Sequence, residues 1–164
     1  MRTSTHRIAC ATPASQRIVR TDPVGTERFA PLLQEVAAGP FFAFVHYKEA
    51  DVTGHESGAE SAAYRESIIS LDEQLQGLLD VLSFAGVLDD TSVLLTTDHG
   101  FSGIFHLSRD PENTDTWIAA LNFALRDDGS VKLLDVTPTV LEYFEIETGA
   151  VEPPLEGASA AFVP

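Results

Sequence analysis

The chain has 164 residues, of which 44% are hydrophobic, and its 25 acidic residues outnumber 10 basic ones for a formal net charge of −15. A chain of this length and apolar content can bury one core, so global disorder is excluded. The acidic balance argues against nucleic-acid backbones and anionic membranes as partners, because both need Lys and Arg. The single cysteine, Cys10, excludes an internal disulfide and a Cys-rich zinc site.

Residues 1–27 carry turn residues and little apolar periodicity, which predicts a poorly structured or partner-dependent N-terminal segment. Residues 28–164 are expected to form one domain. No apolar run approaches the roughly 18–20 residues of a membrane span. Residues 1–7 lack the apolar stretch of a signal peptide, so we expect a cytoplasmic protein without membrane contact.

The domain's predicted elements alternate between helices and strands. Apolar residues at helical spacing predict helices over 28–38 and 60–85, and polar residues before Pro138 predict another from Asp135 to Phe144. Residues 50–58 read as a loop and the tail from Glu147 as a surface segment. Short apolar runs predict strands over 41–47, 91–97, 117–123 and 131–134.

This order predicts an α/β fold with a mostly parallel sheet sandwiched between helices. Ligands bind beyond the carboxyl ends of the strands in such sheets. Asp51 to His55 follow the first buried strand, and the Asp98-His99-Gly100 sequence directly follows the second. We therefore expect these two loops at one edge of the sheet.

These loops hold two carboxylates and three of the chain's five histidines. Asp51 and His55 are four residues apart, Gly100 permits a turn after Asp98 and His99, and His106 follows in a glycine-containing loop. Carboxylate and imidazole ligands without thiolate suit Zn, Mn or Fe. The alternative is structural, since Asp-His-Gly also occurs in plain turns and a loop histidine is often only solvated.

The segments YKEADVTGHESG (47–58) and DDTSVLLTTDHGFSG (89–103) with the long helix between them resemble the alkaline phosphatase superfamily. That superfamily includes type I phosphodiesterases/nucleotide pyrophosphatases, sulfatases and cofactor-independent phosphoglycerate mutases. Residues 133–146 and the LEGAS sequence at 155–159 are similar to its C-terminal elements. The resemblance implies an alkaline phosphatase-like fold and chemistry at phosphate or sulfate esters.

The resemblance also implies a division of the metal ligands. Asp51, His55 and His106 match the ligands of the first metal, and Asp98 and His99 match those of the second. This implies zinc, with manganese as an alternative, in one well-liganded site and one partial site. The implied substrate is a small phosphate or sulfate ester.

Family members carry another metal-binding Asp and the nucleophile well before the D-x-x-G-H element. Only 50 residues precede Asp51 here, and the stretch from Cys10 to Arg17 departs from the C-x-P-x-R nucleophile spacing of sulfatases. We interpret the chain as the C-terminal half of the fold, truncated at its N-terminal side, with no catalytic nucleophile identified. A sheet cut in this way exposes apolar surface, which favours a homo-oligomer or a complementing chain.

Three hypotheses follow. The first is a metal-dependent hydrolase of phosphate esters, of phosphodiesterase or phosphatase type with a sulfatase-like fold, incomplete without the nucleophile-bearing half. The second is a non-catalytic metal-binding remnant or subunit that pairs with another chain. The third is an acidic α/β domain without metal. The residues do not choose between phosphate and sulfate, or between monoester and diester.

Overall fold

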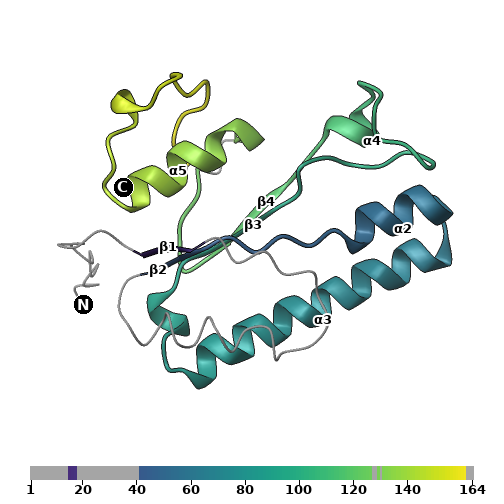
Figure 1. Cartoon of the computed structure of the whole chain (residues 1–164), viewed down its shortest axis with the longest axis horizontal. Helices are drawn as coiled ribbons and strands as arrows, with labels where there is room; N and C mark the ends of the chain where they lie inside the picture. Colours follow the sequence, from purple (N-terminus) through teal and green to yellow (C-terminus); the bar gives the residue numbers. More distant parts are fainter. Residues whose placement is uncertain (1–14, 18–40, 127–128, 130, 162–164) are drawn as a thin grey trace.

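The computed structural model describes residues 15–17, 41–126, 129 and 131–161 (Figure 1). The expected helix over 28–38 and most of segment 1–27 lie outside these residues. The described strands are β1 (Ser15–Arg17), β2 (Phe41–Ala43), β3 (Val93–Thr96) and β4 (Ile118–Leu121). The α-helices are α2 (Glu49–Ser57), α3 (Ala62–Phe84), α4 (Pro111–Thr114) and α5 (Val136–Tyr143). Short 3-10 turns are η2 (Leu88–Asp90), η3 (Leu133–Asp135) and η4 (Thr148–Ala150).

The described strands pair in two ways. β1 runs parallel to β2, with Ser15 opposite Phe41, whereas β3 runs antiparallel to β4, with Val93 opposite Leu121. A parallel return needs a crossover of a dozen or more residues, usually a helix. The excursion from β3 to β4 contains only the four-residue α4 and comes back from the end at which it left. The expected mostly parallel sheet is therefore not confirmed; the structure is mixed helix and strand.

The loop expected over 50–58 is wrong, since residues 49–57 form the helix α2. Glu49 and Asp51 lie in its first turn, where negative charge is favourable to the helix dipole. Gly58, at φ 87°, ends it, and the Ser61 hydroxyl accepts the Tyr64 N–H at 3.0 Å to start α3. The two helices form a hairpin along one side of the molecule (Figure 1).

The described core lies between α3 and the strands. Leu78 and Leu82 are buried on the strand-facing side of α3, where Phe41, Ala43 and Val93 pack against them. Other large apolar side chains stay exposed, among them Phe84 at 90% and Leu107 at 82%. No helix in the described ranges combines the length and hydropathy needed to cross a bilayer.

The strand expected over 131–134 is not formed. Its residues enter η3 instead, because the Asp135 carboxylate accepts the Lys132 N–H at 3.0 Å and folds the chain back into a turn. The predicted helix that follows is confirmed as α5. The C-terminal segment returns to this turn, and the Ala158 N–H donates to Asp135 at 2.9 Å.

Candidate metal centre

Helix α2 presents Asp51 and His55 on the same face, because residues four apart lie one turn above each other. The His55 Nε2 atom lies 3.5 Å from the Asp51 Oδ1 atom. The D-x-x-G-H element therefore lies in a helix, where its Asp and His are one turn apart, and not in the loop expected from the sequence.

The loop after β3 brings His99 and His106 to this face of α2. Gly100 makes the approach possible, since a Cβ atom at this position would lie 2.0 Å from the Glu112 carbonyl oxygen. The Gly100 N–H donates to the Asn113 carbonyl at 2.9 Å, which holds the loop against α4. The glycine of the D-H-G element is therefore required by a close backbone contact.

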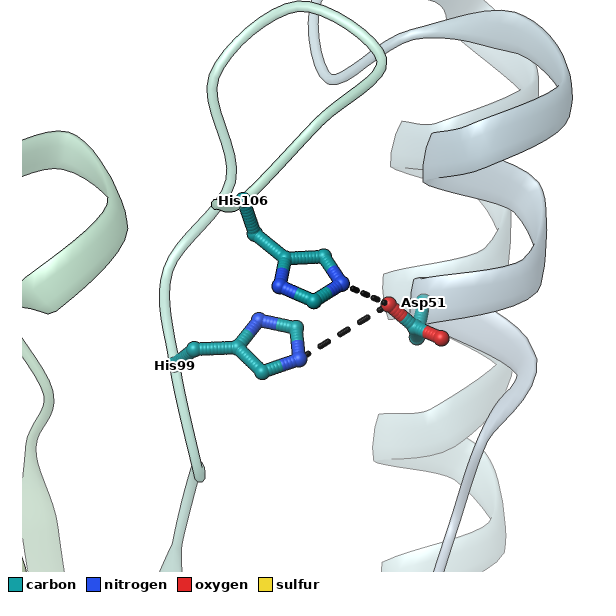
Figure 2. Close-up of side chains that lie close together, drawn as sticks. All are labelled: Asp51, His99 and His106. Carbon is teal, nitrogen blue, oxygen red and sulfur yellow. Dashed lines mark ion pairs between the residues drawn. The ribbon is translucent and has the colours of Figure 1, made fainter. Parts of the chain in front are cut away.

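Three imidazoles converge on one carboxylate oxygen. Asp51 Oδ1 lies 3.4 Å from His106 Nε2 and 3.7 Å from His99 Nε2, and both rings point toward it (Figure 2). The rings of His99 and His106 are stacked with centroids 3.7 Å apart, and the Nε2 atoms of His106 and His55 are 3.1 Å apart. Ligand atoms of Asp51, His99 and His106 all lie within 4.8 Å of one another.

The Asp51 Oδ1 atom is buried and has no hydrogen-bond partner in the described part of the chain. Distances of 3.4–3.7 Å to the imidazole nitrogens exceed those of a good N–H···O bond. A tetrahedral zinc site with N and O ligands at its usual bond lengths separates neighbouring ligand atoms by roughly 3.3 Å. The donor types and spacing therefore fit a divalent cation between these groups.

Backbone carbonyls set the tautomers of two of the rings. His55 Nδ1 lies 2.8 Å from the Ile104 carbonyl and His99 Nδ1 lies 2.8 Å from the Gly100 carbonyl. Carbonyls only accept, so we assign the proton to Nδ1 in both rings. Each Nε2 atom then keeps its lone pair for a metal ion, as is usual for ligating histidines.

Asp98 lies at the rim of this cluster. Its side chain is 78% exposed, and its Oδ1 atom is 3.7 Å from His99 Nε2. The structure thus brings all five expected residues into one neighbourhood, but it places His99 beside Asp51 and His106. The expected division into a three-ligand and a two-ligand site stays a prediction.

The electrostatics of the site favour a cation. Burial raises the pKa of the Tyr64 hydroxyl, and the negative charge of Asp51 raises it further. The charge of Asp51, which disfavours a phenolate at Tyr64, would favour a cation at the same place.

Phe101 is a residue of the site that the sequence pattern did not predict. Its ring contacts the rings of His55, His99, His106 and Tyr64. The available signal was an aromatic residue directly after D-H-G together with the glycine inside the D-x-x-G-H element.

Comparison with known proteins identifies the family of the chain. A family model described as type I phosphodiesterase/nucleotide pyrophosphatase matches residues 11–153. GPI ethanolamine phosphate transferase 1 of Candida glabrata is 35% identical over 108 residues, which cover 62% of this chain and 11% of that protein. GPI ethanolamine phosphate transferase 1 of Saccharomyces cerevisiae is 33% identical over 84 residues, or 48% of this chain and 9% of that protein.

The chain therefore spans about a tenth of the length of these curated relatives. No solved structure gives a significant match. The family model covers well over half of the chain, and so the chain belongs to the type I phosphodiesterase/nucleotide pyrophosphatase family, within the alkaline phosphatase superfamily.

Proposed function

We propose that this chain holds a divalent metal ion, zinc or manganese, and serves the cleavage or transfer of phosphate esters. The observation that carries the proposal is the buried, unpartnered Asp51 Oδ1 atom at the meeting point of three imidazoles. Asp51, His55, His99 and His106 would hold the ion, with Asp98 at the exposed rim. The family match supports phosphoester chemistry for such a site.

A bound divalent ion would supply Lewis-acid polarisation of a phosphoryl oxygen. The reaction forms a bond from an attacking hydroxyl oxygen to phosphorus and breaks the ester P–O bond. The attacking hydroxyl loses its proton and the departing oxygen gains one. The chain's own contribution is geometric, since the Ile104 and Gly100 carbonyls fix two imidazoles before substrate arrives.

The attacking hydroxyl belongs to water in a hydrolase and to an acceptor alcohol in a transferase. The named relatives are ethanolamine phosphate transferases, which favours the inclusion of acceptor alcohols among the assays. The proposed substrate is a small phosphate ester, with sulfate esters as the comparison class.

A second candidate function is a non-catalytic metal-binding subunit. The many large apolar side chains that are exposed, among them Phe84 and Leu107, support it, because another chain could cover such surface. The covering chain would be a second copy of this one or a complementing polypeptide.

The experiment separates metal binding from turnover. Metal-free protein is titrated with Zn²⁺ and Mn²⁺, and bound metal is counted by elemental analysis. Turnover of bis-p-nitrophenyl phosphate, p-nitrophenyl phosphate and p-nitrophenyl sulfate is then measured with and without added ethanolamine or glycerol. The key variant is His55→Ala, and the matched control is His46→Ala, whose ring stacks on Phe44.

Stoichiometric metal with phosphate-ester turnover, both lost in His55→Ala and kept in His46→Ala, is the expected result. Stoichiometric metal without turnover of any ester favours the subunit function. Failure of the wild-type protein to bind either metal would overturn both.

A further inference from the structure

Phe101 is the aromatic side chain at the centre of the histidine cluster. Its ring centroid lies 5.0 Å from that of His55 and 5.3 Å from that of His106, both in edge-type geometry. The His99 ring is 6.2 Å away and tilted. One ring therefore contacts all three imidazoles that face Asp51.

On its other side, the Phe101 ring packs against the backbone of α2. Gly54 is buried, and a Cβ atom at this position would lie 2.8 Å from the Phe101 Cζ atom. Carbon atoms do not approach so closely without a shift, so the ring occupies the space that any other residue at position 54 would fill. Phe101 is thus wedged between the helix that carries Asp51 and the histidine rings.

The histidines differ in how much they need this wedge. Carbonyl oxygens hold His55 and His99 at Nδ1, whereas His106 has no such partner among the described residues. The His106 ring is oriented by its stack on His99 and by the edge of Phe101.

We propose that Phe101, seated on Gly54, is a positioning residue that sets the imidazoles in a metal-binding arrangement before the ion arrives. This inference rests on the proposed function. Residues that orient ligands without touching the metal typically change metal affinity when they are replaced. The pair Gly54 and Phe101 would therefore tune the site although neither side chain offers a ligand atom.

The first test uses Co²⁺ as a spectroscopic probe of ligand geometry in the full chain. Phe101→Leu is expected to lower Co²⁺ affinity by roughly 10- to 100-fold and to change the visible absorption spectrum of the bound ion. The matched control is Phe105→Leu in the same turn, where the ring is 60% exposed. Its affinity and spectrum should equal those of the wild type.

A second variant keeps the ring and moves it. Gly54→Ala adds a methyl group that must displace Phe101, yet alanine is the better helix former. Co²⁺ affinity should fall at least about 10-fold, while a cooperative thermal transition shows that the metal-free variant is folded. In the double variant with Phe101→Leu the alanine should cost less affinity than it does alone, because the displaced ring edge is gone.

Unchanged Co²⁺ affinity and spectrum in Gly54→Ala, beside normal wild-type binding, would overturn this inference and leave the proposed function standing. The inference also fails if the loss of Co²⁺ binding free energy in the double variant equals the sum of the losses in the two single variants. A wild-type chain that binds no Co²⁺, Zn²⁺ or Mn²⁺ overturns the proposed function and this inference together. Loss of folding in Phe101→Leu leaves the decision to Gly54→Ala.

Discussion

Two carboxylates in this molecule occupy opposite electrostatic situations. Asp51 has a buried oxygen that no described donor satisfies, and three imidazoles surround it at 3.4–3.7 Å. Asp135 is also buried, but it accepts the N–H groups of Lys132 and Ala158 and pairs with Arg126. The first carboxylate is the one at which we propose a cation binds, and the second joins two segments of chain.

At this joint, both carboxylate oxygens of Asp135 have hydrogen-bond or ion-pair partners. Burial raises the pKa of its carboxyl, but the two backbone N–H groups and the charges of Arg126 and Lys132 outweigh burial and hold the pKa below its ordinary value. Thr139 extends the joint, since its hydroxyl donates to the Asp135 carbonyl and accepts the Ala160 N–H. The partnered Asp135 carboxylate thus joins two segments of the fold, whereas the Asp51 oxygen has no hydrogen-bond partner among the described residues.

The largest effect is expected from Asp135→Ala. The substitution leaves Arg126 and two backbone N–H groups without their acceptor, and each unsatisfied buried donor costs about 1–3 kcal/mol. Urea unfolding of the metal-free protein measures the loss. A change below about 1 kcal/mol would show that the joint is not a main support of the fold.

Asp51→Asn should lower metal affinity and leave the stability of the metal-free protein unchanged, the reverse of Asp135→Ala. Metal affinity is expected to fall on the order of 100-fold, since the amide keeps the shape but not the charge. The free energy of unfolding of the metal-free protein should not fall, because the removed charge has no hydrogen-bond donor in the described ranges of the chain.

The control for that substitution is Asp72→Asn, the same chemical change at an exposed position of α3. It should leave both metal affinity and stability as in the wild type. A clear loss of metal-free stability in Asp51→Asn would contradict the contrast between the two carboxylates.

Gly157→Ala tests the same contact around Asp135 by steric crowding, without removing a charge. A Cβ atom there would lie 2.0 Å from the Leu134 carbonyl oxygen, so the C-terminal segment must move away from η3. We expect a loss of about 1–3 kcal/mol in unfolding free energy. Gly149→Ala, where the added atom meets open space, is the matched control and should be close to neutral.

The smallest expected effect is the change in unfolding free energy at acidic pH. The folded-state pKa of Asp135 is lowered, so its contribution is full above the unfolded value near 3.8 and is lost as pH falls through the lower folded value. The difference in unfolding free energy between wild type and Asp135→Asn should therefore shrink from pH 5 to pH 3. A constant difference across this range would argue against a stabilising ionised form.

The sequence predicted which residues lie close together at the site, but not that a helix carries Asp51 and His55. The rule that ligands gather beyond strand ends placed Asp51 near His99, and the structure has them together. Residues 50–58 read as a loop because Gly54 and Thr53 are poor helix formers. Only the contact between Gly54 and Phe101 shows why a glycine belongs inside that helix.

Strand direction and the C-terminal turn were beyond the sequence pattern. An apolar run such as 117–123 predicts a strand, and β4 confirms it, but periodicity carries no information on whether the partner runs parallel. At 131–134 the pattern suggested a strand, because the decisive contact joins Asp135 to Ala158, a residue far along the chain.

The Ala59 N–H donates to the Gly103 carbonyl at 2.7 Å, so the chain leaves the metal centre along α3 and comes back to it through β3. Everything between these residues is an excursion whose two ends are tied beside the histidines. Gly86, at its far tip with φ 71° and open space around it, is the natural place to graft a fluorescent reporter. A reporter inserted there would lie far from the histidines, on a segment whose two ends are held beside them, and its fluorescence would test whether ion uptake is sensed at that distance.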